Sequence, residues 1–75
     1  MKVNPRNVEY NTTDKLVYAN IYMSEVPDPL PAKSDDIGDL RKGYDFEVGS
    51  TLYISSTGQL YMSNGDGTWT DQTGV

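Results

Sequence analysis

The stretch GSTLYISSTGQLYMSNGDGTW, residues 49–69, decides the fold because apolar and aromatic residues alternate along it with small polar ones. A period of two is typical of strands that bury one face. The segments STG (56–58) and NGDG (64–67) interrupt the alternation, and both contain the glycines that hairpin turns require. The stretch therefore predicts a three-stranded antiparallel meander at 50–70, with strands at 50–55, 59–63 and 68–70.

The alternation also predicts which side chains share a face of the meander. In the first strand Leu52 and Ile54 share one face, and in the second strand Leu60 and Met62 do. If both pairs face the core, each strand leaves one tyrosine on the opposite face, Tyr53 and Tyr61. Whether the two rings are direct neighbours depends on the register that the loop sets.

Another strand is predicted at residues 15–24, KLVYANIYMS. A helix would gather Leu16, Ala19 and Met23 on one face, but valine, isoleucine and two tyrosines within eight residues favour a strand. One side of this strand carries Val17, Ala19, Ile21 and Met23, and the other carries Leu16, Tyr18, Asn20 and Tyr22.

The two strand regions are joined by a proline-rich segment, residues 25–33, EVPDPLPAK. Proline fixes φ and has no N–H to donate, so this segment is predicted to be an extended connector. A short helical turn or a loop is expected near 34–42, where Ser34 suits an N-cap. Tyr44 and Phe46 can then anchor the connector to the core.

Residues 1–14 are polar, and we expect an N-terminal arm with at most a short extended piece near 7–10. Residues 15–75 then form a single small domain. The sequence thus predicts a mainly β fold, in which strand 15–24 and the meander at 50–70 make a small antiparallel sheet.

The composition argues against catalysis and against a bound cofactor. The 75 residues include no cysteine and no histidine, so disulfides, the usual zinc ligands and the commonest general base are all missing. We expect no enzyme, no cofactor and no metal. A domain of this size buries little surface, which makes association with a partner the remaining source of extra stability.

The charge of the chain limits its partners. A net charge of −5 argues against nucleic acid, and residues 25–47 alone hold seven acidic and three basic side chains. No apolar run is long enough to span a membrane, and the first residues lack the apolar core of a leader. We therefore expect synthesis in the cytoplasm and no membrane partner.

Two segments have the spacing of oxygen ligands for a metal. In NGDGTWTD, residues 64–71, the alternate positions Asn64, Asp66 and Thr68 resemble a calcium loop, but its glycine and its terminal glutamate are missing. A hairpin turn explains the segment better. The three aspartates of SDDIGD, residues 34–39, are best explained as a solvated loop.

Aromatic residues are the most distinctive feature, with six tyrosines, one tryptophan and one phenylalanine. We expect Phe46 and Trp69 inside the core. The tyrosines of the strands cannot all be exposed without forming an adhesive surface. They are the candidate interface residues: Tyr18, Tyr22, Tyr53 and Tyr61.

The opening stretch resembles a pattern of bacteriophage virion proteins, G-D-x-Y-x-N-x-x-T-G-x-x-Y-x-x-N-G-x-x-W, found in head-fibre and tail-fibre repeats and in small structural proteins. The residues that carry the resemblance are Gly49-Ser50, Leu52, Ile54, Thr57-Gly58, Leu60-Tyr61, Asn64-Gly65 and Trp69, where Ser50, Leu52 and Ile54 stand in place of the Asp, Tyr and Asn of the pattern. GYDFEVGS, residues 43–50, also looks like small phage or prophage proteins.

The resemblance implies a structural protein of a tailed phage or prophage particle, located in the virion. Such a protein would bind the capsid, the connector, a fibre or copies of itself. Two alternatives stay open from the residues alone. One is a carbohydrate-binding module that uses Tyr53, Tyr61 and Trp69 for stacking. The other is an acidic regulator of a host protein that uses residues 35–47.

Overall fold

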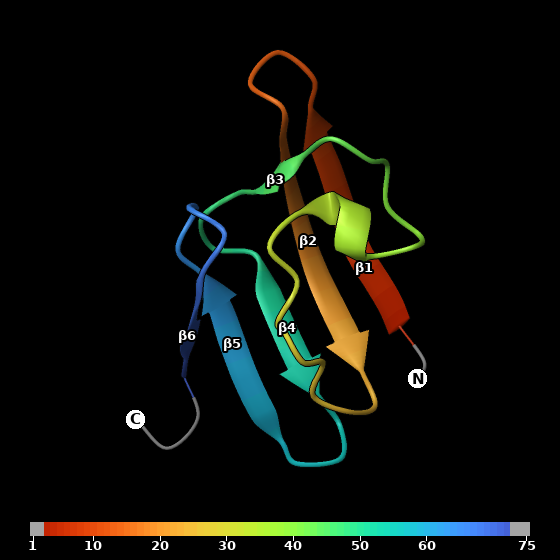
Figure 1. The fold of residues 1–75 in the computed structure, drawn as a ribbon, viewed down its shortest axis with the longest axis vertical. Helices are drawn as coiled ribbons and strands as arrows, with labels where there is room; N and C mark the ends of the chain where they lie inside the picture. Colours follow the sequence, from red (N-terminus) through yellow and green to blue (C-terminus); the bar gives the residue numbers. More distant parts are fainter. Residues whose placement is uncertain (1–2, 73–75) are drawn as a thin grey trace.

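The computed structural model describes residues 3–72 and confirms the mainly β prediction (Figure 1). Within these residues six strands form one sheet, and a single 3-10 turn lies in the long connection across it. The elements are β1 (Val3–Asn11), β2 (Leu16–Met23), η1 (Ser34–Asp36), β3 (Asp45–Phe46), β4 (Thr51–Ile54), β5 (Gln59–Ser63) and β6 (Trp69–Asp71). Within the described residues no helix is long and apolar enough to cross a membrane.

The sheet has the strand order β1-β2-β4-β5-β6, and β3 pairs with the first part of β2 beside β4. The meander β4-β5-β6 is antiparallel, as predicted, and β1 is antiparallel to β2. The pairs β2–β4 and β2–β3 are parallel, so the sheet is mixed. They are parallel because residues 24–50 return the chain to the end of the sheet where β2 began.

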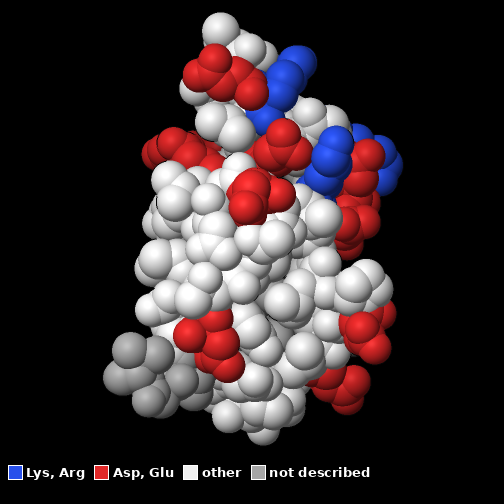
Figure 2. All heavy atoms as spheres, turned by 60° about the vertical axis from the view of Figure 1, so that its left-hand side comes forward, with Lys and Arg blue, Asp and Glu red and all other residues white. Residues whose placement is uncertain are grey.

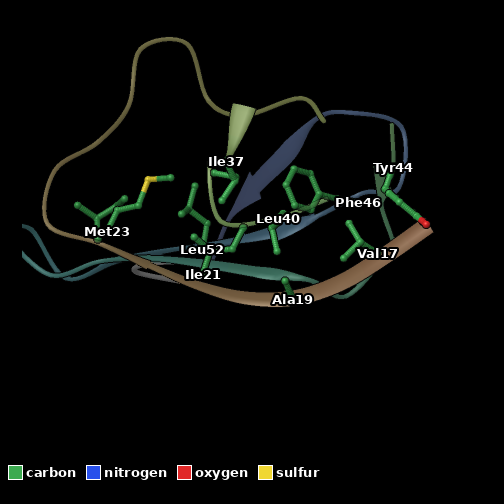
Figure 3. Close-up of a cluster of buried hydrophobic side chains, with 10 residues drawn as sticks. Val17, Ala19, Ile21, Met23, Ile37, Leu40, Tyr44, Phe46 and Leu52 are labelled. Carbon is green, nitrogen blue, oxygen red and sulfur yellow. The ribbon is translucent and has the colours of Figure 1, made fainter. Parts of the chain in front are cut away.

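The core lies on one face of this sheet, and the crossover 24–50 covers it. Every second residue of β2 points to that face, with Val17, Ala19 and Ile21 fully buried. The loop of the crossover covers this face with Ile37, Leu40 and Tyr44, while β3 adds Phe46 and β4 adds Leu52 and Ile54 from the sheet itself (Figure 3). The expected anchoring by Tyr44 and Phe46 is therefore confirmed.

The strands β3 and β4 form one interrupted partner of β2, and the Ser50 side chain bridges the interruption. The ladder is interrupted between Phe46 and Thr51, after the Glu47 N–H has donated to the Val17 carbonyl of β2 at 2.8 Å. The fully buried Ser50 hydroxyl accepts a hydrogen bond from the Ala19 N–H at 3.2 Å and donates one to the Val17 carbonyl at 3.4 Å. The buried Ala19 N–H, which has no backbone partner across the interruption, is thereby satisfied, as a buried strand requires.

The segment 34–44 is a closed loop rather than a helix with a serine cap. Ser34 is the first residue of η1 instead of its N-cap, which is Lys33. The buried Ser34 hydroxyl accepts from the Tyr44 N–H, and the Ser34 N–H donates to the Tyr44 carbonyl. The Asp35 carboxylate accepts from the Gly43 N–H, so three hydrogen bonds join the two ends of the loop.

The expected arm at 1–14 is corrected by the structure, because β1 occupies Val3–Asn11 and pairs with β2. Asn7 has a positive φ of 55°, and together with Val8 it forms a bulge opposite Ala19. The bulge shifts the phase of alternation, so Val8 and Tyr10 both pack against the core. This shift hides the strand from a search for strict period two.

We predict that Ser50→Ala lowers the free energy of unfolding by about 1–3 kcal/mol, because it leaves the buried Ala19 N–H without its partner, while the Val17 carbonyl still accepts from the Glu47 N–H. Urea denaturation followed by Trp69 fluorescence measures this change. Ser56→Ala, an exposed residue of the β4–β5 turn, is the control and should change stability by less than about 0.5 kcal/mol. Equal effects of the two substitutions would contradict the bridging role of Ser50.

Candidate protein-binding face

The second face of the sheet, called the outer face here, is defined by the residues that alternate with the core. Cross-strand partners point to the same side of a sheet, so the registers of β2, β4 and β5 fix its members. They are Leu16, Tyr18, Asn20 and Tyr22 of β2, Thr51 and Tyr53 of β4, and Leu60 and Met62 of β5. Within residues 3–72 the long connection lies on the core side, and the remaining connections are short turns.

Three of the four predicted interface tyrosines lie on the outer face, and Tyr61 does not. Tyr61 pairs with Leu52 and packs against the core, whereas Leu60 pairs with Tyr53. The prediction that Leu60 and Met62 face the core is therefore wrong.

The length of the β4–β5 loop explains this error. A loop of three residues, 56–58, would pair Ser55 with Gln59 and place Leu52 opposite Met62. The observed loop has four residues, 55–58, and pairs Ile54 with Gln59, which moves every side chain of β5 to the other face. Gly58, at a φ of 75°, closes this loop by donating its N–H to the Ile54 carbonyl at 2.8 Å.

The centre of the outer face is aromatic. The rings of Tyr22 and Tyr53 meet edge to face with their centroids 5.9 Å apart. The Arg6 guanidinium of β1 lies 5.6 Å from the centroid of the Tyr22 ring. Tyr22 is still 45% exposed and Met62 38% exposed, which places two of the most exposed large apolar side chains on this face. The outer face therefore exposes large apolar side chains, the kind of feature from which an interaction surface can be proposed.

A row of polar side chains crosses the outer face beside the aromatic residues. The Asn7 amide donates to the Asn20 side-chain oxygen at 2.9 Å, and the Asn20 amide donates to the Thr51 hydroxyl at 2.8 Å. The Asn20 amide also lies 3.4 Å from the Tyr18 hydroxyl. These bonds join β1, β2 and β4 and hold the side chains of the face in fixed positions.

Tyr61 and Trp69 belong to the core side. The Gln59 amide donates to the Tyr61 hydroxyl at 3.0 Å. The Trp69 ring lies 5.2 Å from Phe46, and its Nε1–H donates to the Pro31 carbonyl at 2.6 Å. Phe46 is buried as predicted, while Trp69 is partly buried and fastens the proline-rich connector to the sheet.

The charges of the chain lie mainly away from the outer face. Of its eleven acidic residues only Glu9 and Asp45 occupy strand positions that share this face, and Arg6 lies there as well. Most other acidic residues lie in the turns and in the crossover. Figure 2 shows one side of the molecule, where lysine and arginine side chains gather at the upper end and the lower part carries only acidic ones.

In the two candidate metal segments, side-chain oxygens already accept hydrogen bonds from within the chain. In the 64–68 turn, the Thr68 hydroxyl and N–H both donate to the Asp66 carboxylate, and the Asn64 amide donates to Thr68. The Asp36 carboxylate accepts from the N–H groups of Ala32 and Lys33. No group of three acidic residues that could hold a metal is found among residues 3–72.

In comparisons with known proteins, no protein-family model, no curated protein and no solved structure matches the chain. The function is therefore argued from the outer face and from the residues themselves.

The 64–68 turn yields a prediction about pH. The hydrogen bonds from Thr68, first its hydroxyl and then its N–H, lower the pKa of Asp66. A lowered folded-state pKa means that the turn is stabilised above the ordinary Asp pKa and loses this stabilisation as the pH falls through the lowered value.

We expect Thr68→Val to raise the pKa of Asp66 toward its ordinary value of about 3.9. A carboxyl-carbon NMR titration measures this shift, and Thr57→Val in the β4–β5 turn should leave the pKa of Asp66 unchanged. An Asp66 pKa that does not respond to Thr68→Val would contradict the assigned cause.

Proposed function

We propose that this protein is a non-enzymatic assembly component of a tailed-phage or prophage particle, which binds other protein through its outer face. The observation that carries the proposal is a sheet face whose large side chains are left uncovered by residues 3–72. These side chains are Tyr18, Tyr22, Tyr53, Leu60 and Met62.

The composition of the outer face suits a protein partner. Tyrosine and methionine are enriched in protein–protein interfaces, and charged residues are depleted at their centres. Here Tyr22, Tyr53 and Met62 form the centre, while Arg6 and Glu9 lie on the edge strand β1. Because cross-strand hydrogen bonds already fix Asn20, little side-chain freedom is lost on binding at this position.

The assignment to a phage particle is supported by the resemblance of residues 49–69 to phage virion proteins. The glycines that carry this resemblance occupy turns, with Gly58 and Gly65 at positive φ. The match thus concerns a hairpin scaffold, and the outer face is the part of that scaffold which meets a partner.

A carbohydrate-binding function is less well supported by the ring geometry. Sugars stack on open ring faces, but the rings of Tyr22 and Tyr53 meet at 61°, and Arg6 lies over Tyr22. Tyr61 and Trp69 point to the core side and are partly buried. In the acidic segment of the regulator hypothesis, Asp35 and Asp36 hold the loop together.

The test is whether the protein co-purifies with phage particles through its outer face. Particles released from the host are purified on a density gradient, and the chain is quantified in them by mass spectrometry. We expect the wild-type chain in the particle fraction and at least a tenfold loss for Tyr22→Ser combined with Tyr53→Ser, since a few central side chains carry most interface energy.

Val26→Ser is the matched control, because Val26 is an equally exposed apolar residue in the connector on the core side. It should leave incorporation unchanged. Absence of the wild-type chain from particles would contradict the proposal, and glycan-array binding lost with Tyr53→Ser would favour the carbohydrate alternative instead.

A further inference from the structure

We infer that the outer face binds the outer face of a second copy of this chain, in a two-fold arrangement that pairs Arg6 of each copy with Glu9 of the other. This inference rests on the proposed function in taking the outer face as protein-binding, and it names the partner.

The charge distribution favours a second copy as the occupant. Two copies with a net charge of −5 each repel one another wherever their acidic loops meet. Among the described residues, the charged side chains at strand positions of the outer face are Arg6, Glu9 and Asp45. The opposite charges of Arg6 and Glu9 compensate each other. It is therefore a face through which two identical acidic chains can approach without bringing their acidic crossovers together.

The positions of Arg6 and Glu9 suit an isologous contact, in which Arg6 of each copy contacts Glu9 of the other. Arg6 lies opposite Asn20 and Glu9 opposite Tyr18, so both are on the outer face, one on each side of the level of Ala19. A two-fold axis that crosses the strands at this level stacks β1 on β1 in opposite directions. Arg6 then faces Glu9 twice, and both side chains can reach across the roughly 10 Å between packed sheets.

The edge strand β1 is poorly suited to the competing mode of association, in which two sheets join edge to edge. Pro5 has no N–H to offer, and the bulge at Asn7 and Val8 interrupts the ladder of β1. Large side chains that fill the space between two sheets are present on the face instead: Tyr18, Tyr22, Tyr53, Leu60 and Met62. Face-to-face packing is therefore favoured over extension of the sheet.

The experiment is sedimentation equilibrium of the full chain up to about 1 mM, the range in which a weak dimer forms. We expect a monomer–dimer equilibrium that Tyr22→Ser and Tyr53→Ser each weaken and Val26→Ser does not. Arg6→Glu and Glu9→Arg should each weaken the dimer about tenfold, because each creates two like-charge contacts. The double exchange Arg6→Glu with Glu9→Arg should restore it.

Each outcome decides between the proposals. A strict monomer at the highest concentration overturns this inference, and if the monomer is found in particles the proposed function stands with a different partner protein. A dimer that is insensitive to the tyrosine substitutions overturns the choice of face. A double exchange that stays as weak as the single ones overturns the two-fold pairing. A dimer absent from particles contradicts the proposed function alone.

Discussion

The fold depends on β2 being paired along both of its edges, although the chain supplies no single strand long enough for the second edge. β1 covers one edge, and the short strands β3 and β4 cover the other. Between them the Ser50 hydroxyl takes the place of a backbone partner for the Ala19 N–H and adds a second, longer hydrogen bond to the Val17 carbonyl. Because β2 carries core residues on one face and tyrosines on the other, this pairing positions both the core and the outer face.

The parallel pairing of β2 also gives the core one layer of sheet and one layer of irregular chain. A parallel pair such as β2–β4 needs a crossover, which in most proteins is a helix. Prolines prevent a helix here, and a loop closed by Ser34 and Tyr44 brings Ile37 and Leu40 onto the sheet instead. The loop part of the crossover lies on one side of the sheet, which leaves the outer face without a covering layer among residues 3–72.

The sequence alone predicts the mainly β class, the meander and the anchoring of the crossover, because alternation and turn residues are local signals. Parallel pairing of β2 with β4 depends on the path of the whole crossover, so no local pattern contains it. The predicted β4–β5 loop, 56–58, is one residue shorter than the observed loop. The prediction therefore places Tyr61 on the outer face, since a shift of one residue exchanges the faces of a strand. The bulge at Asn7 concealed β1 in the same way.

The uncovered outer face and the small one-sided core both bear on the free energy of unfolding. A chain without cysteines whose described residues bury ten apolar side chains has a modest reserve of stability. Any partner that binds the folded state alone raises that stability by mass action. Burial of Tyr22 and Tyr53 would then stabilise β2 and β4, the strands that also carry the core. The proposed assembly would therefore be coupled to folding through the same two strands.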